Sequence, residues 1–432
     1  MTPPSSPVVR TRLRNGLEIR LKEIRTAPLI SFWVWYRVGS RNERPGTTGI
    51  SHWVEHMMFK GTPSFPAGVL DRAISRDGGL WNAFTFFDWT AYFETMPADR
   101  IDLALRLEAD RMVHSLFEPS EVASERTVII SEREGHENEP TFRLGEELQA
   151  AAFRVHAYHH QIVGDRADLE SMTRDDLHRH YRSYYVPDNA LIAVAGDFRI
   201  RPMLERLRRL FGRISKRPAL HPAVRPEPEM SGERRVSVEG PGDTTYLELA
   251  YRAPAAKSPD FFPLAVLDSI LAGASSLNLF GGGLSNKTSR LYRALVLGDL
   301  AASVGGDLTA TIDPYLYGLS ATVRPGVTAD NVLRGIDQEI QRLQDEPIEA
   351  DELVKAVKQA RALFAYGSES ITNQAFWLGY SEMFADYAWF EGYLQRLEEV
   401  TAEDVRRVAQ TYLRSSQRVV ATYLPTGGGD GG

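Results

Sequence analysis

Apolar and polar residues alternate in two stretches that lie in opposite halves of the chain. The stretches LISFWVWYRVG (29–39) and YLELAYRAP (246–254) both show the alternation of a β-strand, and a loop and a helix pattern follow each. Residues 15–24 form a further strand pattern, which we expect to pair antiparallel with 29–38 as its neighbour. Strands and helices are mixed without strict alternation, which favours an α+β fold over a doubly wound parallel sheet.

A second similarity links the ends of the two halves. Residues 173–197 match residues 401–425, and both segments predict an N-capped helix followed by an apolar strand. The matched positions are Tyr36-Arg37 with Tyr251-Arg252, and Thr173, Asp176 and Tyr184 with Thr401, Asp404 and Tyr412. Two similarities in the same order predict two homologous domains, each a mainly antiparallel sheet flanked by helices. Chance likeness of amphipathic helices is the alternative interpretation.

The middle of the chain marks the boundary between these domains. Residues 215–230 carry Pro218, Pro222, Pro226 and Pro228, a density that blocks both helix interiors and sheet ladders. We therefore predict a domain over 1–214, an extended linker over 215–230, a second domain over 231–425 and a flexible Gly-rich tail over 426–432.

Composition excludes several classes of function and site. The net charge of −7, from 50 basic and 57 acidic residues, argues against nucleic acid as the main partner, because phosphate binding needs a basic face. The chain has no cysteine, so any metal must be held by His, Asp and Glu. No apolar run reaches the ~18 residues of a membrane span.

The N-terminal residues do not have the pattern of a secretory signal. The first sixteen, MTPPSSPVVRTRLRNG, include no apolar stretch after a basic start, so no signal peptide is predicted. The chain as written is expected in the cytoplasm. A periplasmic protein from which a signal peptide had been removed would have the same sequence.

The segment PGTTGISHWVEHMMFKGT (45–62) carries the clearest chemical pattern. We expect a helix capped by Thr47 or Thr48 and ended by Gly61. Within it His52 and His56 lie one turn apart on one face, where two imidazoles can chelate one Zn²⁺. Glu55 borders this face, so its carboxylate can take the proton of a water on the metal as general base. This is the inverted zinc-protease motif H-x-x-E-H.

A third ligand has to come from elsewhere in the chain. A catalytic zinc takes three protein ligands and leaves one position for water. Segment 124–140 offers six candidates, and spacing alone does not choose among them: Glu125, Glu132, Glu134, His136, Glu137 and Glu139. A non-metal alternative is a surface helix whose two histidines pair with Glu55.

The chain resembles the M16 metallopeptidase family, which includes pitrilysin, insulin-degrading enzyme and the mitochondrial processing peptidase. The likeness covers nearly the whole chain and is strongest to the short bacterial members. It is carried by the segments 15–21, 36–62, 78–93, 125–133, 184–197 and 289–295. By its spacing from the second histidine, the resemblance implies Glu132 as third ligand, and it implies that Glu125 supports the site from behind the ligands.

The resemblance also implies a substrate-binding strand. Residues 80–93 alternate and are rich in aromatic residues, which by themselves predict an ordinary core strand. In the family, the Asn-Ala-x-Thr part of this strand is an edge that pairs with the substrate backbone. Asn82, Ala83 and Thr85 match that pattern.

The second half lacks the chemistry of the first. Counting from the Tyr-Arg pairs, Leu267, Ile270 and Leu271 stand at the positions of His52, Glu55 and His56, so one zinc per chain is expected. Family members that complete the site from the second half carry an Arg followed by a Tyr. Here Val296 stands at the Arg position and Ala302 or Ser303 at the Tyr position.

These features predict a zinc-dependent endopeptidase with Glu55 as general base. The resemblance implies a clamshell of two chains around a closed chamber, with peptides or unfolded segments as substrates. The missing Arg–Tyr pair predicts a heterodimer with a homologous subunit that lacks H-x-x-E-H and supplies the pair. Two alternatives remain: a non-catalytic structural or presenting subunit, and a maturation peptidase for one dedicated precursor.

Overall fold

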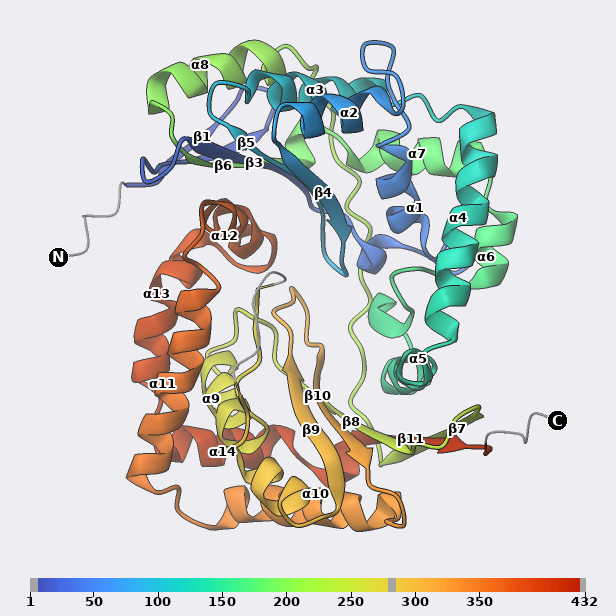
Figure 1. Ribbon diagram of the computed structural model, residues 1–432, viewed down its shortest axis with the longest axis vertical. Helices are drawn as coiled ribbons and strands as arrows, with labels where there is room; N and C mark the ends of the chain where they lie inside the picture. The colour runs from blue at the N-terminus through green and yellow to red at the C-terminus, as the bar shows by residue number, and fades with distance from the viewer. Residues whose placement is uncertain (1–6, 279–284, 428–432) are drawn as a thin grey trace. The chain divides into compact units, whose positions relative to one another are not determined.

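The computed structural model describes residues 7–278 and 285–427. Within them the chain forms two compact units, each built on one β-sheet (Figure 1). The expected Gly-rich tail falls largely outside the described residues, which end at residue 427. The Pro-rich segment 215–230 has no regular secondary structure and is mostly exposed. The first unit comprises Met1–Arg133, His160–Val224 and Glu369–Tyr387, and the second comprises Glu134–His159, Arg225–Ser368 and Ala388–Gly432.

The first unit carries a six-stranded sheet in the order β1-β2-β6-β3-β5-β4. Its strands are β1 (Val9–Arg12), β2 (Glu18–Glu23), β3 (Leu29–Tyr36), β4 (Leu80–Thr85), β5 (Thr90–Pro97) and β6 (Ala190–Gly196). Its helices are α1 (Ile50–Met57), α2 (Val69–Arg76), α3 (Asp102–His114), α4 (Pro119–Glu137), α6 (Arg166–Ser171), α7 (Arg174–Tyr184), α8 (Ile200–Phe211) and α12 (Ile371–Phe384), with short helices η1 (Ser40–Asn42) and η3 (Pro187–Asn189). The last turn of α4 belongs to the second unit.

The second unit carries a five-stranded sheet in the order β7-β11-β8-β10-β9. Its strands are β7 (Arg234–Gly240), β8 (Tyr246–Arg252), β9 (Ala301–Leu308), β10 (Leu316–Val323) and β11 (Arg418–Pro425). Its helices are α5 (Pro140–Ala152), α9 (Phe261–Leu271), α10 (Ala329–Asp345), α11 (Ala350–Tyr366), α13 (Tyr387–Glu398) and α14 (Ala402–Tyr412), with short segments η2 (Ala157–His159), η4 (Tyr292–Val296) and η5 (Ser415–Gln417).

The two sheets repeat one topology. In each, one strand pair is parallel (β2 with β6, β7 with β11) and the following neighbours are antiparallel. Tyr36 pairs with Ala190 in the first sheet, and Tyr251 pairs with Arg418 in the second. The α+β class and the two mainly antiparallel sheets are therefore confirmed.

The capping boxes repeat as well. The Thr173 hydroxyl accepts the backbone N–H of Asp176 at the start of α7, and Thr401 accepts that of Asp404 at the start of α14. In both helices the Asp side chain accepts the backbone N–H of the threonine in return. Such a box satisfies two backbone donors that the first helical turn leaves open. The sequence similarity thus extends to the local hydrogen bonds.

One expected strand pairing is wrong. Strands β2 and β3 follow each other in the sequence, but β6 lies between them, parallel to β2 and antiparallel to β3. The reason is burial, because β6 (ALIAVAG) is buried along its whole length and must lie in the interior of the sheet.

The compact units depart from the expected boundaries at 1–214 and 231–425. Helix α12 comes from the second half of the sequence but packs on β3 and β6 of the first sheet, whereas α5 comes from the first half and packs on the second sheet. Figure 1 shows α12 on one face of the first sheet and α3 and α8 on the other. This explains why β3 is apolar on both faces: Trp33 and Trp35 point toward α12, Phe32 and Val34 point to the opposite face, and all four are fully buried.

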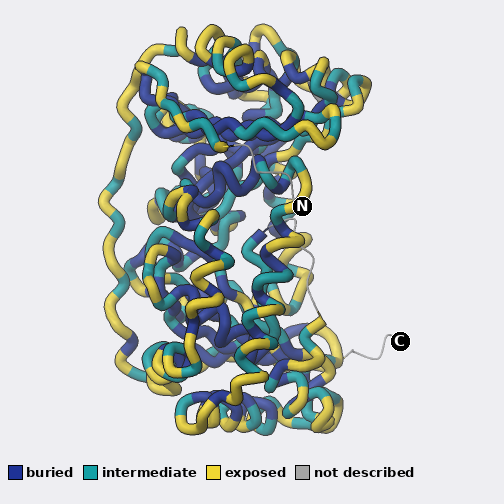
Figure 2. Tube along the Cα trace, turned by 90° about the vertical axis from the view of Figure 1, so that its left-hand side faces the viewer, coloured by how far each residue is buried: buried dark blue, intermediate teal, exposed yellow. Residues whose placement is uncertain are grey.

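Burial is concentrated inside each unit. In Figure 2 the buried residues, in dark blue, gather within the units, and exposed residues lie on the outer turns. Among the described residues no helix combines the length and apolar character needed to cross a bilayer.

Candidate metal centre

Helix α1 is held at its start by Glu43 and not by a threonine. The backbone N–H groups of Gly49 and Ser51 each donate to the Glu43 carboxylate over 2.8 Å. His160 lies 2.8 Å from the same carboxylate, and both side chains are buried. A carboxylate at a helix N-terminus satisfies open donors and suits the helix dipole. The side chains of residues 43 and 160 thus fix the position of the helix that carries the site.

The expected cap by Thr47 or Thr48 is therefore wrong. The Thr48 hydroxyl donates to Asp168 over 2.8 Å and accepts the backbone N–H of Asp165, while the Thr47 hydroxyl donates to the carbonyl of Arg44. The two bonds of Thr48 tie the segment before α1 to the start of α6. They fix the direction in which the chain enters the helix.

Helix α1 presents His52 and His56 side by side. Their ring centroids lie 4.6 Å apart, and both side chains are only partly exposed. The helix ends at Met57, before Gly61, so the expected end at Gly61 is wrong; Gly61 has a φ of +97° in the turn that follows. The one-turn spacing places both rings on one face of α1, as the sequence predicted.

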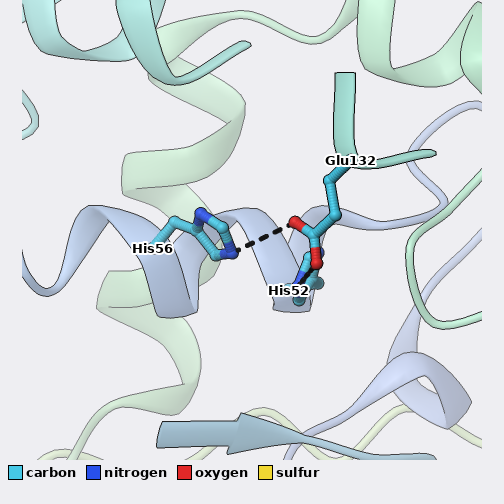
Figure 3. Close-up of side chains that lie close together, drawn as sticks. All are labelled: His52, His56 and Glu132. Carbon is cyan, nitrogen blue, oxygen red and sulfur yellow. Dashed lines mark ion pairs between the residues drawn. The ribbon is translucent and has the colours of Figure 1, made fainter. Parts of the chain in front are cut away.

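Glu132 of α4 completes a group of three possible ligands. Its Oε1 lies 3.9 Å from Nε2 of His52 and its Oε2 lies 3.7 Å from Nε2 of His56. Figure 3 shows the carboxylate directed at both rings from the neighbouring helix. One ligand atom from each residue can be chosen so that all lie within 4.8 Å of one another.

The donor set and its spacing suit a zinc ion. Ligands at ~2.0–2.1 Å from a tetrahedral ion lie about 3.3 Å from each other, slightly closer than the separations found here. Two imidazoles and one carboxylate also leave the fourth position open, as in catalytic zinc sites. Of the six candidates in segment 124–140, only Glu132 joins the two histidines in this group within the described part of the chain.

Glu125 lies behind His56, on the side away from Glu132. Its Oε1 is 2.8 Å from Nδ1 of His56, and its Oε2 forms an ion pair with Lys60. Burial opposes ionisation of Glu125, but the hydrogen bonds from His56 and Lys60 lower its pKa below the ordinary range. A proton on Nδ1 leaves the lone pair on Nε2, the nitrogen that faces Glu132.

Glu55 is buried beside this group and is held from the sheet. The Thr85 hydroxyl donates to its Oε2 over 2.5 Å, from the end of β4. Burial raises the pKa of Glu55 to about 7, although Thr85 and His56 act in the opposite direction. A carboxylate whose pKa lies near neutral pH is suited to accept and return a proton.

Strand β4 is an edge of the first sheet. It pairs with β5 on one side, so its other side presents unpaired backbone groups. Asn82 is exposed and Ala83 is buried. Thr85 is half-buried, and its side chain contacts Glu55. The structure therefore places the three predicted substrate residues on an edge strand whose last residue contacts Glu55.

Some residues of the site escaped the sequence analysis. Lys60 lies four residues after His56, and this helical spacing could have indicated a link to the same cluster. The sequence analysis predicts only substrate binding for Thr85 and not its hydrogen bond to Glu55. No local pattern in the sequence joins Glu43 to His160.

The histidines at 156 and 160 are not part of the ligand group. His156 and His160 are buried, with 2% and 5% of their surface exposed, and each pairs with a carboxylate. His156 contacts Asp313 in the second unit, while His160 belongs to the first. Both histidines are therefore structural.

The second unit has no counterpart of the ligand group among its described residues. Leu267, Ile270 and Leu271 lie on α9, where every residue is buried. These three counterpart positions carry aliphatic side chains, which serve packing and have no ligand atoms.

The described residues at the positions of the expected Arg–Tyr pair are neither arginine nor tyrosine. Val296 lies at the end of the helical segment η4, and Ala302 and Ser303 lie on the edge strand β9. The nearby Arg290 forms two hydrogen bonds with Glu352: Nε lies 3.1 Å from Oε1 and Nη2 lies 2.6 Å from Oε2.

Comparison with known proteins agrees with this geometry. Residues 19–166 match the family model "Insulinase (Peptidase family M16)", and residues 171–360 match "Peptidase M16 inactive domain". The chain is 28% identical to the zinc protease PqqE of Helicobacter pylori, over 96% of this chain and 92% of that protein. It is 27% identical to a probable mitochondrial-processing peptidase subunit beta of Arabidopsis thaliana, over 98% and 79%.

Solved structures give the same result for the fold. A protease from Helicobacter pylori superimposes with a TM-score of 0.90 at 28% identity, over 98% of this chain and all of that one. A structure titled peptidase M16 inactive domain, from Pseudomonas fluorescens, has a TM-score of 0.86 at 19% identity, over 97% and 98% of the chains. The second likeness shows the fold alone.

Proposed function

Because the chain belongs to the M16 peptidase family, we propose that it is a zinc-dependent endopeptidase that hydrolyses peptides or unfolded protein segments. The observation that carries this proposal is the meeting of His52, His56 and Glu132 beside a buried Glu55. The names of the relatives as zinc proteases support the choice of metal. One zinc per chain follows from the apolar counterpart helix α9.

In this proposal each residue of the site has one task. His52 and His56 hold the ion through their Nε2 atoms, and Glu132 holds it through its carboxylate. Bound zinc supplies a Lewis acid that polarises the scissile carbonyl and lowers the pKa of water. Glu55 accepts the proton of the attacking water and delivers it to the leaving amine. The Thr85 hydroxyl keeps the Glu55 carboxylate in place for both transfers.

Substrate recognition is assigned to β4. An extended peptide pairs with the free edge of β4 as an additional strand. This pairing places its scissile bond near Glu55, which Thr85 contacts from the end of β4. Backbone pairing reads extended shape more than side chains, so broad sequence tolerance is expected. Folded proteins do not present such a segment, which restricts substrates to peptides and unfolded regions.

A partner subunit is the second part of the proposal. The Arg–Tyr positions hold Val296 and Ala302 or Ser303, so the group that stabilises charge on the carbonyl oxygen has to come from another chain. We assign this to a homologous subunit that lacks H-x-x-E-H, in a closed dimeric chamber. Full turnover by the purified chain alone would contradict this part.

The test is a zinc-loaded preparation assayed on several unrelated quenched fluorescent peptides. We expect Glu55→Gln to keep its zinc and to lose activity by a factor of ~10²–10⁴, the usual contribution of a general base. Glu134→Gln is the matched control, because Glu134 is an exposed carboxylate on the same helix as Glu132. Equal activity of Glu55→Gln and wild type, alone and with the partner, would favour a non-catalytic subunit. Cleavage of a single peptide would favour a dedicated maturation enzyme.

A further inference from the structure

The first unit contains a cavity that shares no residue with the zinc-ligand group. It has a volume of about 410 Å³ and lies among α3, α7, η3 and the segment that follows α8. Figure 1 shows α3 and α8 next to each other on the face of the first sheet opposite α12. Small-molecule sites in proteins typically have volumes of ~300–1,000 Å³.

The inner wall of this cavity is apolar and aromatic. Its buried lining includes Met112, Tyr181, Tyr185, Val186 and Pro187, with the half-buried Leu210 and Ile214 beside them. The hydroxyl of Tyr181 donates to the backbone carbonyl of Arg111 over 2.8 Å, and its ring packs against Tyr185 at 5.6 Å. The wall is therefore fixed by hydrogen bonds and ring packing.

The rim of the cavity is strongly basic. Four exposed arginines line it: Arg106, Arg182, Arg213 and Arg217. Arg106 donates to the backbone carbonyl of Asp102. Across residues 7–278 and 285–427, no carboxylate forms an ion pair with Arg182, Arg213 or Arg217.

One carboxylate, Asp110, also lines the cavity, but both of its oxygens are engaged. The Thr62 hydroxyl donates to Oδ2, and Nδ1 of His114 lies 2.8 Å from Oδ1. The charge around the opening is therefore clearly positive, in a protein whose net charge is −7. Guanidinium groups bind carboxylates and phosphates through paired hydrogen bonds.

From this combination we propose a second binding site, for a small amphipathic carboxylate. Its aliphatic or aromatic body occupies the apolar wall near Tyr185 and Leu210, and its anionic group meets Arg182 and Arg213 at the rim. Burial of the ligand's apolar body and ion pairing of its carboxylate contribute separately to the affinity, so each contribution can be removed by itself. The site is independent of the proposed peptidase activity.

The test uses sodium decanoate as probe, measured by isothermal titration calorimetry on the full chain. We expect one molecule to bind per chain, at least tenfold more tightly than acetate, which lacks the body, or decanamide, which lacks the charge. The affinity should fall as salt is raised, because the arginines are exposed. Decyl phosphate distinguishes a carboxylate site from a general anion site. Binding to decyl phosphate alone would overturn the assignment.

Variants locate the bound molecule. We expect Arg182→Gln and Arg213→Gln each to weaken decanoate binding about tenfold, and Leu210→Trp to abolish it by filling the cavity. Arg201→Gln is the matched control, since Arg201 is an exposed arginine of α8 outside the cavity lining. Glu55→Gln should bind decanoate like wild type, so failure of the peptidase proposal would leave this one standing. Absence of decanoate binding, or an equal effect of Arg201→Gln, would show that the proposal is wrong.

Discussion

Nδ1 of His56 lies 2.8 Å from Oε1 of Glu125, a residue 69 positions further along the chain. The contact fixes which ring nitrogen carries the proton and leaves the other one directed at Glu132. Lys60 forms an ion pair with the second oxygen of Glu125, so Glu125 and Lys60 act as one unit behind His56.

We predict that this unit sets zinc affinity. Glu125→Gln and Lys60→Met should each weaken zinc binding by about 10–100-fold, the usual effect of losing a partner behind a ligand. Competition with a chromophoric chelator measures the affinity directly and does not depend on activity. The control is Glu121→Gln in the first turn of the same helix α4. Unchanged zinc affinity in both variants would mean that Glu125 contributes to packing and not to zinc binding.

Substitution of Thr85 tests whether its hydroxyl supports the function of Glu55. Thr85→Val removes the hydroxyl that donates to Glu55 over 2.5 Å and keeps the shape of the side chain. We expect kcat to fall about tenfold and the zinc content to stay unchanged. A tenfold loss corresponds to ~1.4 kcal/mol, which is about the contribution of one hydrogen bond to a charged group. Thr85→Ser should restore most of the activity. A rise in KM with constant kcat would instead support a role in substrate pairing alone.

Gly379 of α12 packs directly against Trp35 of the first sheet. A Cβ atom at this position would lie 2.0 Å from Nε1 of Trp35, which is fully buried. Gly379→Ala should therefore destabilise the first unit by ~1–3 kcal/mol through overpacking, seen as a lower unfolding temperature. Gly392→Ala is the control, because its nearest neighbour is the flexible end of Arg396 at 3.5 Å. There the higher helix propensity of alanine should stabilise the protein slightly.

Asp268 should make stability depend on pH. Burial raises its pKa to about 7 in the folded protein, although hydrogen bonds from Ser275 and Tyr317 lower it. An unfolded aspartate has a pKa of about 3.9, so between these values the folded state holds a proton that the unfolded chain has released. The contribution of Asp268 to stability is thus full below about pH 4 and is lost as pH rises through 7.

Asp268→Asn removes this titration and keeps the shape. We expect the stability of wild type relative to the variant, measured by thermal unfolding, to decrease between about pH 4 and pH 7 and to level off above pH 7. A constant difference across this range would show that the carboxyl does not hold a proton in the folded state.

The two homologous domains could be predicted because local sequence patterns indicate the elements that they share. The Thr-Asp capping boxes at 173 and 401 and the apolar strands that follow them depend on neighbouring residues only. The exchange of α5 and α12 between the units could not be predicted in the same way. Helix α12 is apolar nearly all round, which indicates burial but not the sheet against which it is buried.

The sequence by itself determined the facing of His52 and His56, because 3.6 residues per turn put positions four apart on one side of any helix. It also determined that aliphatic residues stand at the counterpart positions in the second half, Leu267, Ile270 and Leu271. Resemblance to a family, and not spacing, singled out Glu132 from six candidates. Only the tertiary structure brought Thr85 to Glu55 and His160 to Glu43, since these contacts join separate elements. Helical periodicity acts between near neighbours in the chain, whereas contacts between elements depend on how whole helices and strands pack.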